Sequence, residues 1–283
     1  MAQEQQNPGF EQLHQSIEAV IIEGRQKQSA FGLEAAETHY TSLLRKIRIC
    51  EVAALNEKGL VYRMQNRYSK AEAEFKTALS ISDQNNDIDG KAVALASILD
   101  LKRTGQYGGP DYEQDLPLAK IYKIETQKVL DRMPAEPPRI SRVVARIQIG
   151  LFEHDTKQYS KALEIYNLAD KELRSLIMKD PNNTYFKNRE SRIATIKGNT
   201  LEDLGQSEEA FAEQMKAWEN CTELNDVRGQ TNAARSMAQM LRDDNKTDEA
   251  RKWFQIALEM ALRVGDRNVI NLATQELKEL DSK

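Results

Sequence analysis

The chain has few of the residues that break helices or cross-link a fold. Its 283 residues include two cysteines, seven prolines and thirteen glycines, and aromatic residues make up 6%. Cys50 and Cys221 are far apart and form no CxxC pair, so we expect two reduced, partly buried thiols in a reducing compartment. No segment alternates apolar and polar residues over strand length. With strong helix formers dominating the composition, we predict an all-α protein.

The chain also lacks a strong net charge and a long apolar run. The 40 basic and 44 acidic residues give a net charge of −4, which favours neither nucleic acid nor an anionic membrane as a partner. No stretch approaches the length needed to span a membrane, and the sequence MAQEQQNPGFEQ at the N-terminus is unlike a signal peptide. We therefore predict a cytoplasmic protein.

Motifs for catalysis and for metal binding are missing as well. His14, His39 and His154 are widely spaced and form no HExxH motif, and no glycine-rich phosphate loop or GxSxG motif occurs. The acidic run at 111–115 lacks the glycine and glutamate of a calcium-binding EF-hand loop. We expect no catalytic residue, no metal, no cofactor and no enzymatic activity.

What the sequence does contain is a spacing that recurs five times. A small residue is followed twelve positions later by alanine, and in four cases an aromatic residue follows that alanine by four. Such a step spans the end of one helix, a tight turn and the start of the next helix, so it predicts repeated hairpins of closely crossing helices. The pairs are Gly24–Ala36, Gly59–Ala71, Gly150–Ala162, Gly198–Ala210 and Ala238–Ala250, and the aromatic residues are Tyr40, Phe75, Tyr166 and Phe254.

Breaks in this pattern give the expected boundaries. A flexible lead over 1–11 precedes a solenoid over 12–283. The third hairpin is irregular, with Ala119 as its crossing alanine, an insertion at 105–115 and a proline-rich end at 134–138. Each predicted hairpin has its turn at a polar or glycine-containing site, and the second helix of the irregular hairpin is expected to begin near Leu116. The predicted hairpins cover 17–51 (turn at Phe31-Gly32), 52–85 (turn at 65–67), 87–142, 143–180 (turn near 157–158), 184–226 (turn at Gly205) and 229–264 (turn at 243–245), and a capping helix covers 268–280.

The pattern resembles the tetratricopeptide repeat family, most closely at Gly59, Tyr62, Ala71 and Phe75. It departs at Gln214, where an aromatic residue is expected, and at Leu43, where alanine is expected. Alanine-to-alanine steps of 35, 48, 43, 48 and 40 resemble the subclass with repeats of about 40 residues. The resemblance implies a right-handed α-solenoid of about six hairpins plus the capping helix, acting as a protein-interaction scaffold or adaptor.

In this family the first helix of each pair lines a concave groove. An asparagine amide can hydrogen-bond both edges of an extended peptide, and arginines can bind carboxylates with two hydrogen bonds. Leu60, Ile147 and Leu151 would supply an apolar seat. We predict that the groove binds a peptide or an extended acidic segment through one wall formed by Arg192, Asn199, Arg235, Gln239 and Arg242, with Asn56, Arg63 and Leu151 elsewhere along it. Thr195 and Ser236 replace the lysine and arginine of a chaperone-tail clamp, so chaperone tails are not expected partners.

The alternative is a regulatory switch in which a peptide or small ligand changes the pitch of the solenoid. Its cues are the insertion at 105–115 and the proline-rich break at 134–138, which together could act as a hinge. The insertion could equally be a partner contact or a passive loop. Self-association through the terminal helix or the concave face is a further possibility.

Overall fold

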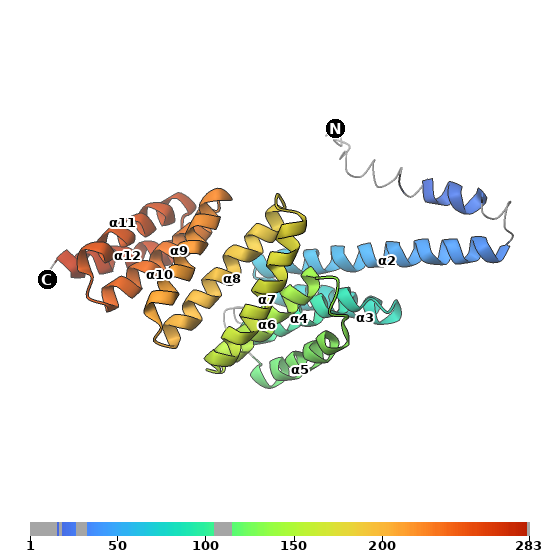
Figure 1. Ribbon diagram of the computed structural model, residues 1–283, viewed down its shortest axis with the longest axis horizontal. Coiled ribbons are helices and arrows are strands. Elements are labelled where there is room, and N and C mark those ends of the chain that lie inside the picture. The colour runs from blue at the N-terminus through green and yellow to red at the C-terminus, as the bar shows by residue number, and fades with distance from the viewer. Residues whose placement is uncertain (1–15, 17–18, 27–32, 105–114, 282–283) are drawn as a thin grey trace. The chain divides into compact units, whose positions relative to one another are not determined.

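The computed structural model describes residues 16, 19–26, 33–104 and 115–281. These residues are helical apart from short connections, and they contain no strand, so the all-α prediction is confirmed (Figure 1). The lead at 1–11, the turn at Phe31-Gly32 and residues 105–114 of the insertion lie outside the described residues. The helices are α2 (Leu33–Met64), α3 (Tyr68–Gln84), α4 (Ile88–Thr104), α5 (Leu116–Arg132), α6 (Ile140–Asp155), α7 (Tyr159–Lys179), α8 (Thr184–Asp203), α9 (Ser207–Glu223), α10 (Val227–Asp243), α11 (Thr247–Val264) and α12 (Arg267–Asp281).

The chain divides into two compact units between residues 91 and 92, within α4. In the first unit, α2 packs against α3, and the helical segment at 19–26 packs against the start of α2. There, a Cβ added at Gly24 would lie 2.7 Å from the Tyr40 ring, and His39 Nε2 lies 2.7 Å from the Val20 carbonyl oxygen. The first predicted hairpin is therefore present in the residues described.

One boundary was wrong. We expected one hairpin to end at residue 51 and the next to begin at 52, but α2 continues without a break from Leu33 to Met64. Residues 44–55 contain no glycine, proline or asparagine, so nothing in this stretch favours a turn. The second helix of the first hairpin and the first helix of the second are consequently one rod.

In the second unit, three hairpins follow one another: α6 with α7, α8 with α9, and α10 with α11. Each helix also packs against the next, since α7 contacts α8, α9 contacts α10 and α11 contacts α12, as in an α-solenoid. The turns lie where they were predicted. Lys157, Gly205 and Asn245 have φ values of 61°, 75° and 61°, and this left-handed conformation ends the first helix of each pair.

The recurring small residues are the points where paired helices touch. A Cβ added at Gly150 would lie 2.3 Å from the Tyr166 ring, and one at Gly59 would lie 2.4 Å from the Phe75 ring. A larger residue therefore has no space at these crossings. The partner positions are fully buried: Ala71, Phe75, Ala162, Tyr166, Ala210, Ala250 and Phe254.

The irregular region contains α4 and α5, and its proline-rich end is hydrogen-bonded to the first turn of α6. The Asp115 side chain accepts a hydrogen bond from the Leu118 amide at 2.8 Å and so begins α5 where the sequence predicted it. The carbonyl oxygens of Pro134 and Ala135 accept hydrogen bonds from the Arg142 guanidinium at 2.6 and 2.7 Å. Arg142 is itself paired with buried Glu172 at 2.6 Å. These contacts do not support a hinge at 134–138.

The predicted cap is confirmed. Gly265 has a φ of 71° and ends α11, and α12 then packs three apolar side chains against the last hairpin: Val269, Ala273 and Leu280. Of the two thiols, Cys221 is buried and Cys50 is exposed, so the expectation of burial was wrong for Cys50.

Candidate functional site

Five of the predicted groove residues share one side of α8 and α10, which we call the α8–α10 face. Arg192 and Asn199 lie on α8, and Arg235, Gln239 and Arg242 lie on α10. All five are half-buried. Asn199 and Gln239 occupy matching positions, one residue after the small crossing residues Gly198 and Ala238. The three arginines lie six before, three before and four after the crossing residue of their helix, and these offsets fall on the same side of a helix as the position one after it.

Asn199 is held in place by the residue that breaks the repeat pattern. Gln214, on α9, is fully buried and fills the space over Gly198 that aromatic rings fill in the other hairpins. Its Nε2 donates to Asn199 Oδ1 at 2.7 Å and to the Thr195 carbonyl oxygen at 3.2 Å. The sequence flagged Gln214 as a departure but gave it no role. The structure makes it the residue that orients Asn199.

The two arginines of α10 face a carboxylate of α8. Burial raises the pKa of Glu202, and the negative charges of Asp203 and Asp243 raise it further, while Arg235 and Arg242 oppose the shift. Both guanidinium groups therefore lie close enough to Glu202 to act on its charge.

Arg242 is already engaged by ion pairs. Its guanidinium lies 2.8 Å from Asp243 and also pairs with Glu276 of α12. The sequence treated Arg242 as available for an acidic partner. The structure instead uses it to attach the capping helix to the last hairpin, so its charge is largely compensated from within the chain.

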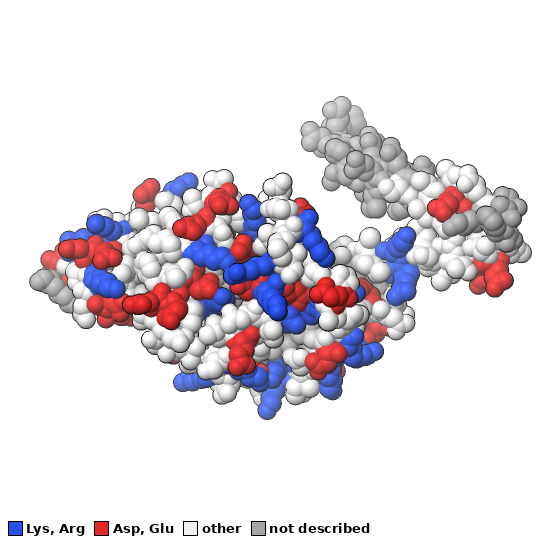
Figure 2. Space-filling view, viewed as in Figure 1, with Lys and Arg blue, Asp and Glu red and all other residues white. Residues whose placement is uncertain are grey.

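Similar pairs continue along the first helices of the preceding hairpins. His154 Nε2 of α6 lies 2.8 Å from the Asp203 carboxylate of α8, and Arg103 of α4 lies 2.6 Å from Asp155 of α6. Figure 2 likewise shows basic and acidic side chains interspersed over the surface of the second unit that it displays. The charges on the described surface are thus mostly matched locally.

Arg192 is close to another buried group. Burial raises the pKa of Tyr166, and the positive charge of Arg192 acts against that rise. The Tyr166 hydroxyl is inaccessible and has no hydrogen-bond partner among the described residues. The Arg192 side chain of α8 therefore lies near the crossing of α6 and α7, the hairpin that precedes α8.

The predicted apolar seat is part of the core. Ile147 is buried, and Leu151 packs with it against Ile193 of α8. In the first unit Asn56 is buried too, although we expected it in an open groove, and Arg63 is half-buried. The reason is that these side chains sit close to the helix crossings, where neighbouring helices cover them.

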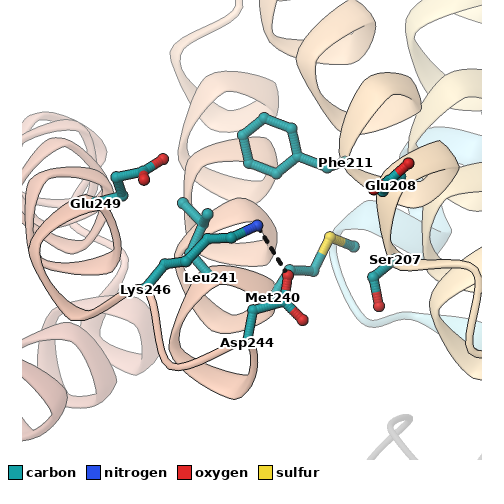
Figure 3. A pocket seen from close by; sticks show the side chains of 8 residues that line it. All are labelled: Ser207, Glu208, Phe211, Met240, Leu241, Asp244, Lys246 and Glu249. Atoms are coloured by element: carbon teal, nitrogen blue, oxygen red, sulfur yellow. Dashed lines mark hydrogen bonds and ion pairs between the residues drawn. The ribbon is translucent and has the colours of Figure 1, made fainter.

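Hollows with apolar floors occur elsewhere on the second unit, away from the α8–α10 face. One of about 260 Å³ has Phe211, Met240 and Leu241 at its floor, and Lys246 pairs with Asp244 at its rim (Figure 3). None of the predicted binding residues lines it. No sequence signal marked this hollow, because its residues belong to no motif.

Within the part of the chain that the structure describes, no three His, Cys, Asp or Glu side chains come together as metal ligands would. Among the same residues, none of the helices combines the length and the apolar character required to cross a membrane.

The sequence of the second hairpin matches a known family model. Residues 52–85 match the family model described as Tetratricopeptide repeat. The chain carries a tetratricopeptide repeat. The match covers Gly59, Ala71 and Phe75, which confirms the resemblance seen in the sequence. The subclass with repeats of about 40 residues stays a prediction.

Solved structures support the same fold, and no curated protein matches the chain. A Pseudomonas aeruginosa PilF structure aligns with a TM-score of 0.52 at 18% identity, over 82% of this chain and 93% of that one. Aspartyl phosphate phosphatase F from Bacillus subtilis gives 0.57 at 16%, over 85% and 58%. A signal transduction ATPase with a tetratricopeptide repeat sensor from Pyrococcus horikoshii gives 0.55 at 17%, over 94% and 38%. At these identities the likeness concerns the fold.

Proposed function

We propose that the chain is a non-enzymatic protein-interaction scaffold whose α8–α10 face binds an extended acidic peptide segment. The observation that carries the proposal is the hydrogen bond from Gln214 to Asn199 Oδ1. Because that bond engages the amide oxygen, the Asn199 Nδ2 group is oriented to donate to a peptide carbonyl. A buried side chain that fixes a half-buried amide is typical of a preorganised binding residue.

Charge selectivity would come from Arg192 and Arg235. Arg192 lies on the same helix as Asn199, seven residues before it, and Arg235 lies on the next helix of the face. A guanidinium can bind a carboxylate with two parallel hydrogen bonds, which favours acidic side chains in the ligand. Since Arg242 pairs with Glu276, we assign it to the attachment of α12 and not to ligand binding.

Selection of displayed random peptides on the purified chain tests the proposal. We expect acidic, extended peptides to be enriched, and an Arg192→Glu/Arg235→Glu variant to lose them. The matched control is Arg228→Glu/Arg263→Glu, which makes the same charge change at exposed arginines of α10 and α11. Retention of the peptides by the first variant, or equal loss in both, would rule the α8–α10 face out.

Replacing Gln214 separates orientation from folding. Gln214→Met keeps the volume of the buried side chain but removes the donor to Asn199. Because Asn199 is only half-buried, water can replace that donor, and we expect little loss of stability. We expect weaker peptide binding, by about 10-fold for the loss of about 1.4 kcal/mol, at an unchanged unfolding midpoint. Undiminished affinity would show that Gln214 has no part in binding.

The regulatory-switch alternative stays a prediction with a narrower basis. The proline-rich segment is fastened by Arg142, and most of the insertion at 105–115 lies outside the described residues. Small-angle scattering with and without the selected peptides tests it. A scaffold keeps its radius of gyration on binding, whereas a switch changes it.

A further inference from the structure

Because α2 is one continuous helix, the first and second hairpins lack the packing contact that successive hairpins make elsewhere in the chain. In the rest of the repeat array, the second helix of one hairpin turns back so that the first helix of the next can pack against it. Left-handed residues make such turns at Asn86 and Asn225, with φ values of 52° and 54°. Within α2 no turn occurs, so the halves at 33–50 and 52–64 cannot fold against each other.

The second half of α2 exposes the surface that a preceding hairpin would cover. In α6, α8 and α10, the residues five before, one before and two after the small crossing residue are all buried. In α2 the same three positions are Ala54, Lys58 and Val61, and all three are exposed, Val61 by 50%. The buried counterparts are Ala145, Ile149 and Phe152 in α6, Ile193, Lys197 and Thr200 in α8, and Ala233, Met237 and Met240 in α10.

The first half of α2 exposes the surface that a following hairpin would cover. Eleven residues after the crossing alanine, the other hairpins place a side chain that is at most 2% exposed: Ser82, Leu173, Cys221 and Ala261. In α2 this position is Ile47, which is 40% exposed. Leu44, on the same side of the helix, is exposed too. Each half therefore presents one side of the same repeat-to-repeat interface.

We propose that a second copy of this chain completes the interface, with two α2 rods packed antiparallel so that the first half of each covers the second half of the other. The two halves are complementary because they are the two sides of a contact that this chain makes three times elsewhere, between α7 and α8, α9 and α10, and α11 and α12. Exchange of such an element between protomers is a common route to dimers.

The contact between α7 and α8 gives the register. There Asp170, eight residues after its crossing alanine, lies 3.7 Å from Lys197, one residue before Gly198. Applied to α2, this pairing sets Leu44 of one copy opposite Lys58 of the other, with residue 51 at the centre. Arg45 then faces Glu57, and Ile47 faces Leu55. Opposite charges and apolar side chains thus meet in one register.

The mass of the full chain in solution is the first test. Light scattering after gel filtration should give twice the 32.3 kDa of a single chain. An Ile47→Glu/Val61→Glu variant should give 32.3 kDa with unchanged helicity. Its control is Met178→Glu/Leu262→Glu, which alters exposed apolar residues of α7 and α11 and should leave the dimer intact. A monomeric wild type, or a dimer that survives the first pair of changes, overturns the proposal.

Cross-linking through the native Cys50 tests the proposed antiparallel packing without an introduced cysteine. It lies one residue from the predicted centre and is exposed, whereas Cys221 is buried. A short bis-maleimide should therefore link two copies through Cys50, and Cys50→Ser should abolish the link while Cys221→Ser keeps it. Absence of linked dimer in the wild type would contradict the antiparallel register.

A turn inserted into α2 tests whether the dimer forms by exchange of α2 between two copies or through an unrelated contact. Insertion of Asn-Gly-Asp after Cys50 lets the two halves of α2 fold against each other within one chain. We expect a helical monomer that resists the cross-linker. If this variant remains a dimer, the dimer does not arise from the missing turn.

Discussion

Replacing Arg142 with methionine tests how the proline-rich segment at 134–138 is attached to α6. The Arg142 guanidinium donates to the carbonyl oxygens of Pro134 and Ala135, and its Nε lies 2.7 Å from Glu172 Oε1. Both side chains of the ion pair are 7% exposed. In Arg142→Met, the carboxylate stays buried without its main partner.

The expected loss in unfolding free energy depends on the partners that Glu172 keeps in Arg142→Met. Removing one partner of a buried ion pair costs about 3–5 kcal/mol because a buried charge is left uncompensated. Glu172 retains the Arg146 guanidinium at 2.6 Å and the Arg139 amide at 2.7 Å, so we expect the lower end, about 3 kcal/mol. The carbonyl groups at 134 and 135 add little, because both residues are exposed and water can replace the lost donors.

Urea unfolding followed by circular dichroism measures this cost. Glu172→Met should be similarly destabilising, and the double variant Arg142→Met/Glu172→Met should cost less than the two single changes together, since no charge of the pair is then left alone. Lys128→Met is the control, because both side chains of its pair with Glu125 are largely exposed and such a pair is worth about 0.5 kcal/mol. A cost below about 1 kcal/mol for Arg142→Met, or strict additivity in the cycle, would refute the reasoning.

Three further changes test separate parts of the structure. Gly150→Ala should lower the unfolding free energy by about 1–2 kcal/mol, because crowding against the Tyr166 ring outweighs the roughly 1 kcal/mol gained in helix propensity, and urea unfolding checks this. Pairing with Asp155 raises the pKa of His154 in the folded chain. The protonated His154 therefore stabilises the fold fully below its unfolded pKa of about 6.5, and this stabilisation is lost as pH rises through the folded pKa. In thermal melts between pH 6 and 8, His154→Gln should make the melting temperature depend less on pH. Asn56→Leu should raise the free energy of unfolding by about 1 kcal/mol, because the buried amide oxygen has no hydrogen-bond partner among the described residues. A lower urea midpoint than that of the unchanged chain would contradict this.

The sequence predicted the helix crossings well because a crossing limits side-chain size. Gly150 and Gly59 lie against aromatic rings with no space for a Cβ, so composition at these positions reflects geometry directly. Turn residues were equally informative, since Lys157, Gly205 and Asn245 adopt the left-handed conformation at the predicted positions. Short-range constraints of this kind recur in every hairpin and can be recognised from one sequence.

The candidate site was harder to predict because its residues contact side chains of other helices, which the local sequence does not specify. Arg242 looked available until Glu276, 34 residues later, proved to pair with it. Ile147 looked like part of a seat, but α8 covers it with Ile193. Periodicity gives the direction of a side chain along its own helix, and it does not say which neighbouring helix occupies that direction.

Gln214 and α2 show why departures from a repeat are informative. An aromatic ring over Gly198 would pack as well as Phe75 packs over Gly59, yet it could not donate a hydrogen bond to Asn199. A turn near residue 50 would let the two halves of α2 pack within one chain, yet it would remove the exposed surface that carries Ile47 and Val61. In both places the residue or turn typical of the repeat would serve folding in a single chain. What replaces it leaves an oriented amide in one case and an uncovered interface in the other, and both are features that a second molecule can bind.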